Sequence, residues 1–105
     1  MASTWSSGTA SSPTANQVIV TTGAIANAHN MDWTAVVNST LAADFLLQHI
    51  DGSGAVLSEQ ELSVLANNAT PFPQLVTTVA VNDEIRVIMK SGLNLGRVSA
   101  SIFWG

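Results

Sequence analysis

Cysteine and tyrosine are absent from this sequence, and basic residues are scarce, with three Lys and Arg side chains against seven Asp and Glu in 105 residues. Without cysteine, the chain has no disulfides, thiolate metal sites or cysteine nucleophile. The net charge of −4 leaves no cluster of Lys and Arg to neutralise phosphates, so we expect no nucleic-acid partner. No apolar run approaches the ~18 residues of a spanning helix, and no polybasic patch occurs, so we expect no membrane partner.

Charged residues amount to 10% of the chain, against about 25% in an average soluble protein. Ser, Thr, Asn and Ala make up the difference. A surface poor in Lys and Glu resembles the composition of protein interfaces, whereas a free monomer carries more surface charge for solubility. The composition therefore indicates a protein that packs against copies of itself or against a lattice.

The chain has the length of a single domain, and its composition divides it into two parts. Residues 1–16 consist of Ser, Thr, Ala and Gly with few apolar side chains, and we expect them to form a flexible N-terminal arm. Trp5 is the large apolar residue of this arm, which is either a disordered tail or a segment that becomes ordered on a partner. Residues 17–105 are expected to form a single β-sandwich domain.

Short β-branched runs bounded by turn residues predict strands along this domain, with a hairpin turn at 51–54. The expected strands are 17–22, 33–38, 41–50, 75–81, 84–90 and 97–104. The return strand of the hairpin begins at 55–57, and residues 58–65 either continue it or form one or two helical turns. Pro71 and Pro73 forbid a central strand around them, so 67–73 is expected to be a loop. The spacing of the turns predicts an all-β fold, namely a jelly-roll-like antiparallel sandwich or barrel.

Candidate metal ligands do not converge on a site. The segment that follows His49 resembles a calcium-binding loop, but His49 at position 1 and Gln60 at position 12 are unsuited to Ca²⁺. We therefore interpret Asp51 to Gly54 as the hairpin turn. His29 and His49 are 20 residues apart without further ligand spacing, which argues against zinc. We expect neither metals nor cofactors.

Catalytic patterns are also lacking. Composition alone supplies candidates for a Ser-His-Asp triad, but the chain has no Gly-x-Ser-x-Gly elbow and no glycine-rich phosphate loop. The carboxylate pairs Glu59/Glu61 and Asp83/Glu84 are typical of solvated turns and edges. We expect that the protein is not an enzyme.

The aromatic residues are the candidate binding residues. Carbohydrate-binding β-sandwiches often display Trp and Tyr on one face, but Trp33 and Trp104 lie in apolar strands that are typical of a core or a subunit interface. We take Trp5 as the anchor of the arm, and Phe103 and Trp104 as residues near a partner interface.

Two segments carry a resemblance to known proteins. Val79 to Val87 (Val-Ala-Val-Asn-Asp-Glu-Ile-Arg-Val) and Ser99 to Trp104 (Ser-Ala-Ser-Ile-Phe-Trp) resemble the closing strands of small trimeric jelly-rolls, including tumour-necrosis-factor-like and collagen-like head domains. Asn82 stands where those folds usually have Gly. The chain is also similar to phage capsid decoration (cement) proteins and head-fibre knobs, which are short, cysteine-free and rich in Ser, Thr and Ala.

This resemblance implies a structural virion protein that binds and stabilises a phage head shell without catalysis. The implied partners are two further copies in a homotrimer and the major capsid protein or another shell lattice. The implied location is the outer capsid surface of the virion, after synthesis in the host cytoplasm. The alternative is a carbohydrate- or receptor-binding β-sandwich module of a fibre or surface protein.

Overall fold

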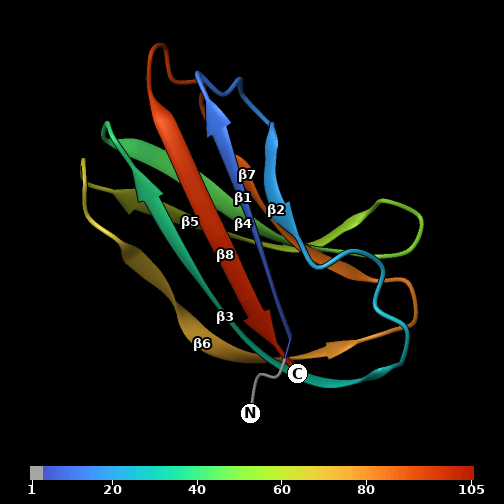
Figure 1. Cartoon of the computed structure of the whole chain (residues 1–105). Helices are drawn as coiled ribbons and strands as arrows, with labels where there is room; N and C mark the ends of the chain where they lie inside the picture. Colours follow the sequence, from blue (N-terminus) through green and yellow to red (C-terminus); the bar gives the residue numbers. More distant parts are fainter. Residues whose placement is uncertain (1–3) are drawn as a thin grey trace.

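The computed structural model describes residues 4–105, with the backbone alone at residues 73–75. All regular structure in this range is β-strand (Figure 1). The strands are β1 (Thr4–Ser11), β2 (Val18–Thr21), β3 (His29–Ser39), β4 (Ala43–Ile50), β5 (Val56–Val64), β6 (Thr70–Val79), β7 (Glu84–Met89) and β8 (Arg97–Trp104).

The strands form two four-stranded antiparallel sheets, sheet A in the order β1-β8-β3-β6 and sheet B in the order β2-β7-β4-β5. Within them β1 pairs with β8, β2 with β7, β3 with β6, and β4 with β5. The chain therefore runs as one long hairpin, with its tip at the β4–β5 turn, that wraps into two layers. This is the jelly-roll arrangement, and it confirms the predicted fold class.

The first described residues differ from the flexible arm expected over residues 1–16. Thr4 to Ser11 form β1, which pairs along its whole length with β8, from Thr4 opposite Trp104 to Ser11 opposite Arg97. The strand forms although its side chains are small, because β8 supplies its backbone hydrogen-bond partners. Residues 1–3 of the expected arm lie outside the described residues.

Residues 67–73 also differ from the expected loop, because β6 begins at Thr70 and includes Pro71 and Pro73. The physical rule behind the expectation holds nevertheless. Proline lacks a backbone N–H and is tolerated on an edge strand, and β6 is the edge of sheet A. The prolines therefore exclude a central strand but not an edge strand.

The hairpin prediction at 51–54 is confirmed, and residues 58–65 continue the return strand up to Val64 rather than forming a helix. The Asp51 carboxylate organises the turn, since it accepts hydrogen bonds from the Ser53 hydroxyl at 2.7 Å and from the Ser53 and Ala55 backbone N–H groups at 2.9 Å each. These donors, with the Ser53 hydroxyl first, lower the pKa of Asp51. The Asp51 carboxylate, which a calcium-binding loop would need as a ligand, is therefore used for hydrogen bonds within the turn.

The core lies between the sheets and is formed largely by alternate residues of the strands. In β7, Ile85, Val87 and Met89 are buried, and in β8 the inward positions from Val98 to Ile102 are buried as well. The fully buried large side chains are Phe45, Phe72, Met31, Ile50, Ile85, Met89 and Ile102. The alternation predicted from the sequence of the two closing strands is thus confirmed.

The two sheets close against each other along β1 and β2. The Ser6 hydroxyl donates a hydrogen bond to the Thr21 carbonyl at 2.8 Å. Gly8 lies against the backbone of Ile19, so close that a Cβ atom on Gly8 would be 1.9 Å from the Ile19 carbonyl oxygen. Only glycine allows this approach, and residue 8 therefore fixes how β1 seals the sandwich.

We expect Gly8→Ala to lower the free energy of unfolding by about 2 kcal/mol, because the added methyl group must push β1 away from β2. Urea denaturation followed by tryptophan fluorescence measures this change. Ser7→Ala, one residue away on the exposed face of β1, is the matched control and should leave the midpoint unchanged. Equal midpoints for the two variants would show that the β1–β2 contact is not tight in solution.

Candidate functional site

Two aromatic side chains lie next to each other on the outer face of sheet A. Trp5 of β1 is directly opposite Phe103 of β8 in the strand register, so both side chains project from the same face of the sheet. Trp5 is 65% exposed and Phe103 is 37% exposed. Adjacent strands are about 5 Å apart, and the two rings therefore form one continuous apolar surface, which we call the aromatic patch.

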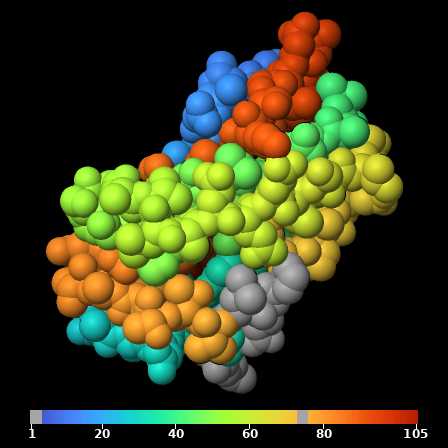
Figure 2. Space-filling model, turned by 180° about the vertical axis from the view of Figure 1, so that it is seen from behind, coloured from blue at the N-terminus to red at the C-terminus, as the bar shows by residue number. Residues whose placement is uncertain are grey.

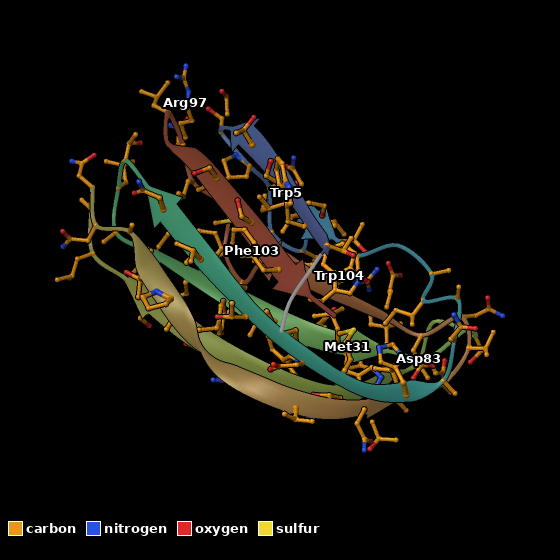
Figure 3. All side chains as sticks on the ribbon, turned by 60° about the horizontal axis from the view of Figure 1, so that its bottom comes forward. Trp5, Met31, Asp83, Arg97, Phe103 and Trp104 are labelled. Atoms are coloured by element: carbon orange, nitrogen blue, oxygen red, sulfur yellow. The ribbon has the colours of Figure 1, made fainter. Side chains whose placement is uncertain are left out.

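The rest of this face is dominated by small hydroxyl side chains. Alternate residues of β1, β8 and β3 project outward with the aromatic patch. They are Ser7, Thr9, Ser11, Ser99, Ser101, Thr34, Val36 and Asn38. The strands of sheet A contain two charged residues, Asp32 and Arg97. Arg97 begins β8, at the end opposite Phe103 (Figure 3).

The outer face of sheet B is different, since it carries a network of charged and amide side chains. Arg86 Nε donates to Gln48 Oε1 at 3.2 Å, and Gln48 Nε2 donates to Glu59 Oε2 at 2.7 Å. Lys90 Nζ donates to Glu61 Oε1 at 2.7 Å, and this carboxylate raises the pKa of Lys90. The two faces of the sandwich therefore suit different partners.

Trp104, the third predicted interface residue, does not belong to the aromatic patch. It follows Phe103 in β8 and consequently projects to the inner face, where it packs against the core. Trp33 is opposite Trp104 in the β3–β8 register and is 3% exposed. Its indole N–H donates to the Thr77 hydroxyl at 2.9 Å. The interpretation of Trp33 and Trp104 as residues of apolar strand faces is consistent with these positions.

The two histidines have separate environments. His29 is exposed, and its Nδ1 is 2.7 Å from the Asn27 carbonyl oxygen. His49 is buried, and its Nε2 lies 2.8 Å from Asp83 Oδ2. Within residues 4–105 as described, no three metal-ligating side chains form a group that could hold an ion.

Asp83 holds the connection between β6 and β7 in place. Its carboxylate accepts a hydrogen bond from the Ala80 backbone N–H at 2.9 Å in addition to the contact with His49. The Ala80 N–H is the main cause, and His49 the second, of a lowered pKa of Asp83. Ser58 is opposite His49 in the β4–β5 register, but its hydroxyl makes no hydrogen bond to the His49 ring, both residues being described. The sequence did not reveal the His49–Asp83 pair, because its members are far apart along the chain.

In the described part of the chain, no helix is long and apolar enough to cross a bilayer. No protein-family model matches the sequence, and no curated protein matches it either.

Solved structures share the fold. The C-terminal domain of the sugar-binding protein EclA has a TM-score of 0.55 over 100% of this chain and 81% of that domain, at 10% identity. A carbohydrate-binding module CBM36, in complex with calcium and xylotriose, has a TM-score of 0.54 over 95% of this chain and 88% of the module, at 13% identity. The CBM22-1–GH10 modules of Clostridium thermocellum xylanase 10B, complexed with xylohexaose, have a TM-score of 0.53 over 96% of this chain, at 8% identity.

The chain spans 24% of the xylanase 10B structure and 54% of BiXyn10A CBM1, which has a TM-score of 0.50, covers 76% of this chain and is 12% identical. At these identities the likeness establishes the β-sandwich fold alone.

Proposed function

We propose that this chain is a non-catalytic carbohydrate-binding module that holds an uncharged glycan on the outer face of sheet A. The observation that carries the proposal is the aromatic patch, in which Trp5 and Phe103 lie side by side and exposed on neighbouring strands. Flat aromatic rings offer a large and rigid apolar surface, which matches the apolar face of a sugar ring.

The surroundings of the patch supply the polar half of such a site. Hydroxyl groups both donate and accept hydrogen bonds, so Ser7, Ser101 and Thr34 beside the patch suit the hydroxyl groups of a glycan. The Thr34 hydroxyl already donates to the Phe72 carbonyl at 3.2 Å and presents its oxygen as an acceptor. Because the strands of this sheet contain only Asp32 and Arg97 as charged residues, the face favours a neutral polymer over an anionic one.

The fold supports the proposal by analogy. Jelly-roll-like sandwiches of similar size serve as sugar-binding modules in other proteins, including the CBM36 and EclA domains. Fold alone does not carry function, and for that reason the aromatic patch is the decisive feature. The homotrimer and the shell lattice stay predictions from the sequence resemblance.

Affinity electrophoresis through gels containing xylan, mixed-linkage β-glucan, arabinan or dextran tests the proposal, with isothermal titration calorimetry on any polysaccharide that retards the protein. We expect at least one neutral polysaccharide to bind. Trp5→Ala and Phe103→Ala should each weaken binding about tenfold or more, because burying a large apolar side chain is worth about 1.5–3 kcal/mol and tenfold corresponds to about 1.4 kcal/mol.

Leu95→Ala is the matched control, since Leu95 is an apolar side chain with 86% exposure near the opposite end of β8 from Phe103. It should bind like the unaltered protein. Binding that survives the combined loss of Trp5 and Phe103 would place the glycan elsewhere. Retardation by none of the neutral polysaccharides would contradict the proposed function itself.

A further inference from the structure

The side of the sandwich opposite the β1–β2 closure contains a small cleft. Its volume is about 120 Å³, and it opens in the hollow beside the yellow-green atoms of β5 in Figure 2. The walls come from both sheets, with β5 along the rim. The lining residues are Trp33, Leu47, His49, Ser58, Glu59, Gln60, Thr77 and Ile85.

Hydrogen bonds hold two of the polar side chains of this cleft, Thr77 and His49, in place. The Thr77 hydroxyl accepts a hydrogen bond from the indole N–H of Trp33 at 2.9 Å, which fixes the orientation of the indole ring. Asp83 engages His49 at Nε2, so Nδ1 is the ring nitrogen left for other partners. Ser58 and Gln60 project from β5 opposite His49 and Leu47 respectively. An aromatic wall with converging polar groups is typical of a binding site rather than of a packing defect.

The chemistry of the lining selects the class of ligand. Trp33, Leu47 and Ile85, each at most 4% exposed, form the closed apolar base of the cleft. The hydroxyl and amide groups of Ser58, Thr77 and Gln60 both donate and accept hydrogen bonds. The lining contains no Lys or Arg, and the Glu59 carboxylate is engaged by Gln48 on the outer face of sheet B, so no cation in the cleft attracts an anion. The volume is well below the roughly 300–1,000 Å³ of sites for drug-sized ligands, so it admits one ring rather than a chain.

We propose that this cleft is a second binding site, separate from the aromatic patch, that takes a single uncharged sugar ring such as a free monosaccharide or the end of a glycan. The sugar class rests on the proposed function, but the site does not share residues with the aromatic patch. Trp33 closes the cleft at its base, and Gln60 and Ser58 are the groups on β5 that hydrogen-bond to the ring. Asp83 is a positioning residue that orients His49.

The test uses the three indole N–H signals in a ¹H–¹⁵N spectrum of the full chain, assigned with single Trp→Phe variants. D-xylose, L-arabinose, D-glucose and D-galactose are titrated separately, with glycerol as a non-ring control. We expect at least one sugar to shift the Trp33 signal saturably while the Trp5 signal stays in place. A polysaccharide that binds the aromatic patch should shift the Trp5 signal instead.

Ser58→Leu fills the cleft from an edge strand and should abolish the Trp33 shift. Ser63→Leu, on the opposite face of the same strand, is the matched control and should retain it. A Trp33 signal that no sugar moves in the unaltered protein would overturn the proposal, and so would a Trp33 shift that disappears in Trp5→Ala. A Trp33 shift without any polysaccharide binding at Trp5 would leave the cleft standing while the proposed function at the aromatic patch fails.

Discussion

Replacing Asp83 with Ala should lower the free energy of unfolding by about 3 kcal/mol. The change deletes the acceptor for the Ala80 N–H and for His49 at once, and it leaves buried polar groups without partners. The side chains of His49 and Asp83 are 10% and 6% exposed, so water replaces the lost contacts poorly. Urea denaturation of the variant and the unaltered protein at pH 7 measures the difference.

Asp83→Asn is the control that keeps the shape and one acceptor oxygen, and it should recover part of the loss. It also tests the acid response. The pKa of Asp83 is lowered in the folded protein, so its contribution to stability is present above the unfolded-state value of 3.8 and is lost as the pH falls through the folded-state value. Below about pH 4 the unaltered protein should therefore lose stability more steeply than Asp83→Asn. Asp51, whose pKa is also lowered, is present in both proteins, so the difference between the two acid curves reports mainly on Asp83. Parallel acid curves would contradict this role of Asp83.

Phe45→Ala is expected to have the largest effect, a loss of about 3–5 kcal/mol. Phe45 is fully buried in β4 between β5 and β7, opposite Leu62 and Met89. Truncation removes its burial from water and leaves a cavity that the surrounding strands do not fill. Because the total stability of a domain is about 5–15 kcal/mol, the variant should unfold at a much lower temperature in a calorimetric scan.

The same substitution at Phe103 separates core packing from surface chemistry. Phe103 is on the outer face of sheet A, and Phe103→Ala should change the melting temperature far less than Phe45→Ala while weakening glycan binding. If both variants lost stability equally, Phe103 would be part of a packed interface within the chain rather than of an open binding face.

Much of the fold could be predicted from local sequence. In β7 and β8 every inward position is apolar, whereas Arg86, Ser99 and Ser101 lie at outward positions. This period of two specifies both the strand and the buried face. The turn at Asp51 was predicted as well, because its side chain and its two glycines favour a tight connection over a metal loop.

The two outer strands of sheet A, β1 and β6, could not be predicted in the same way. β1 is made of Ser, Thr, Gly and Ala, whose local preference for a strand is weak, and it is ordered by pairing with β8 far along the chain. Gly8, which reads as a flexible residue in the sequence, is required by a contact with Ile19 that only the folded structure shows. The edge position of β6, which accommodates Pro71 and Pro73, is likewise a property of the topology.

The candidate sites could likewise be predicted only in part from the sequence. Trp5 and Phe103 were selected from composition and position, but the strand register was needed to place them side by side and to separate them from Trp104. His49 and Asp83 gave no joint signal, because contacts across 34 residues of sequence are set by the pairing of β4 with β7. Trp33 and Gln60 meet at the cleft because the two sheets pack against each other, which local sequence does not show either.

The edge strands of the sandwich determine how readily the backbone of one copy can pair with that of another. An exposed edge strand offers unpaired backbone groups to another chain and promotes fibrous aggregation. Here β1 and β2 close against each other, Pro71 and Pro73 interrupt the donors of β6, and β5 carries Glu59 and Glu61. Copies of the chain held close together would therefore find few free backbone groups to pair with along these edges.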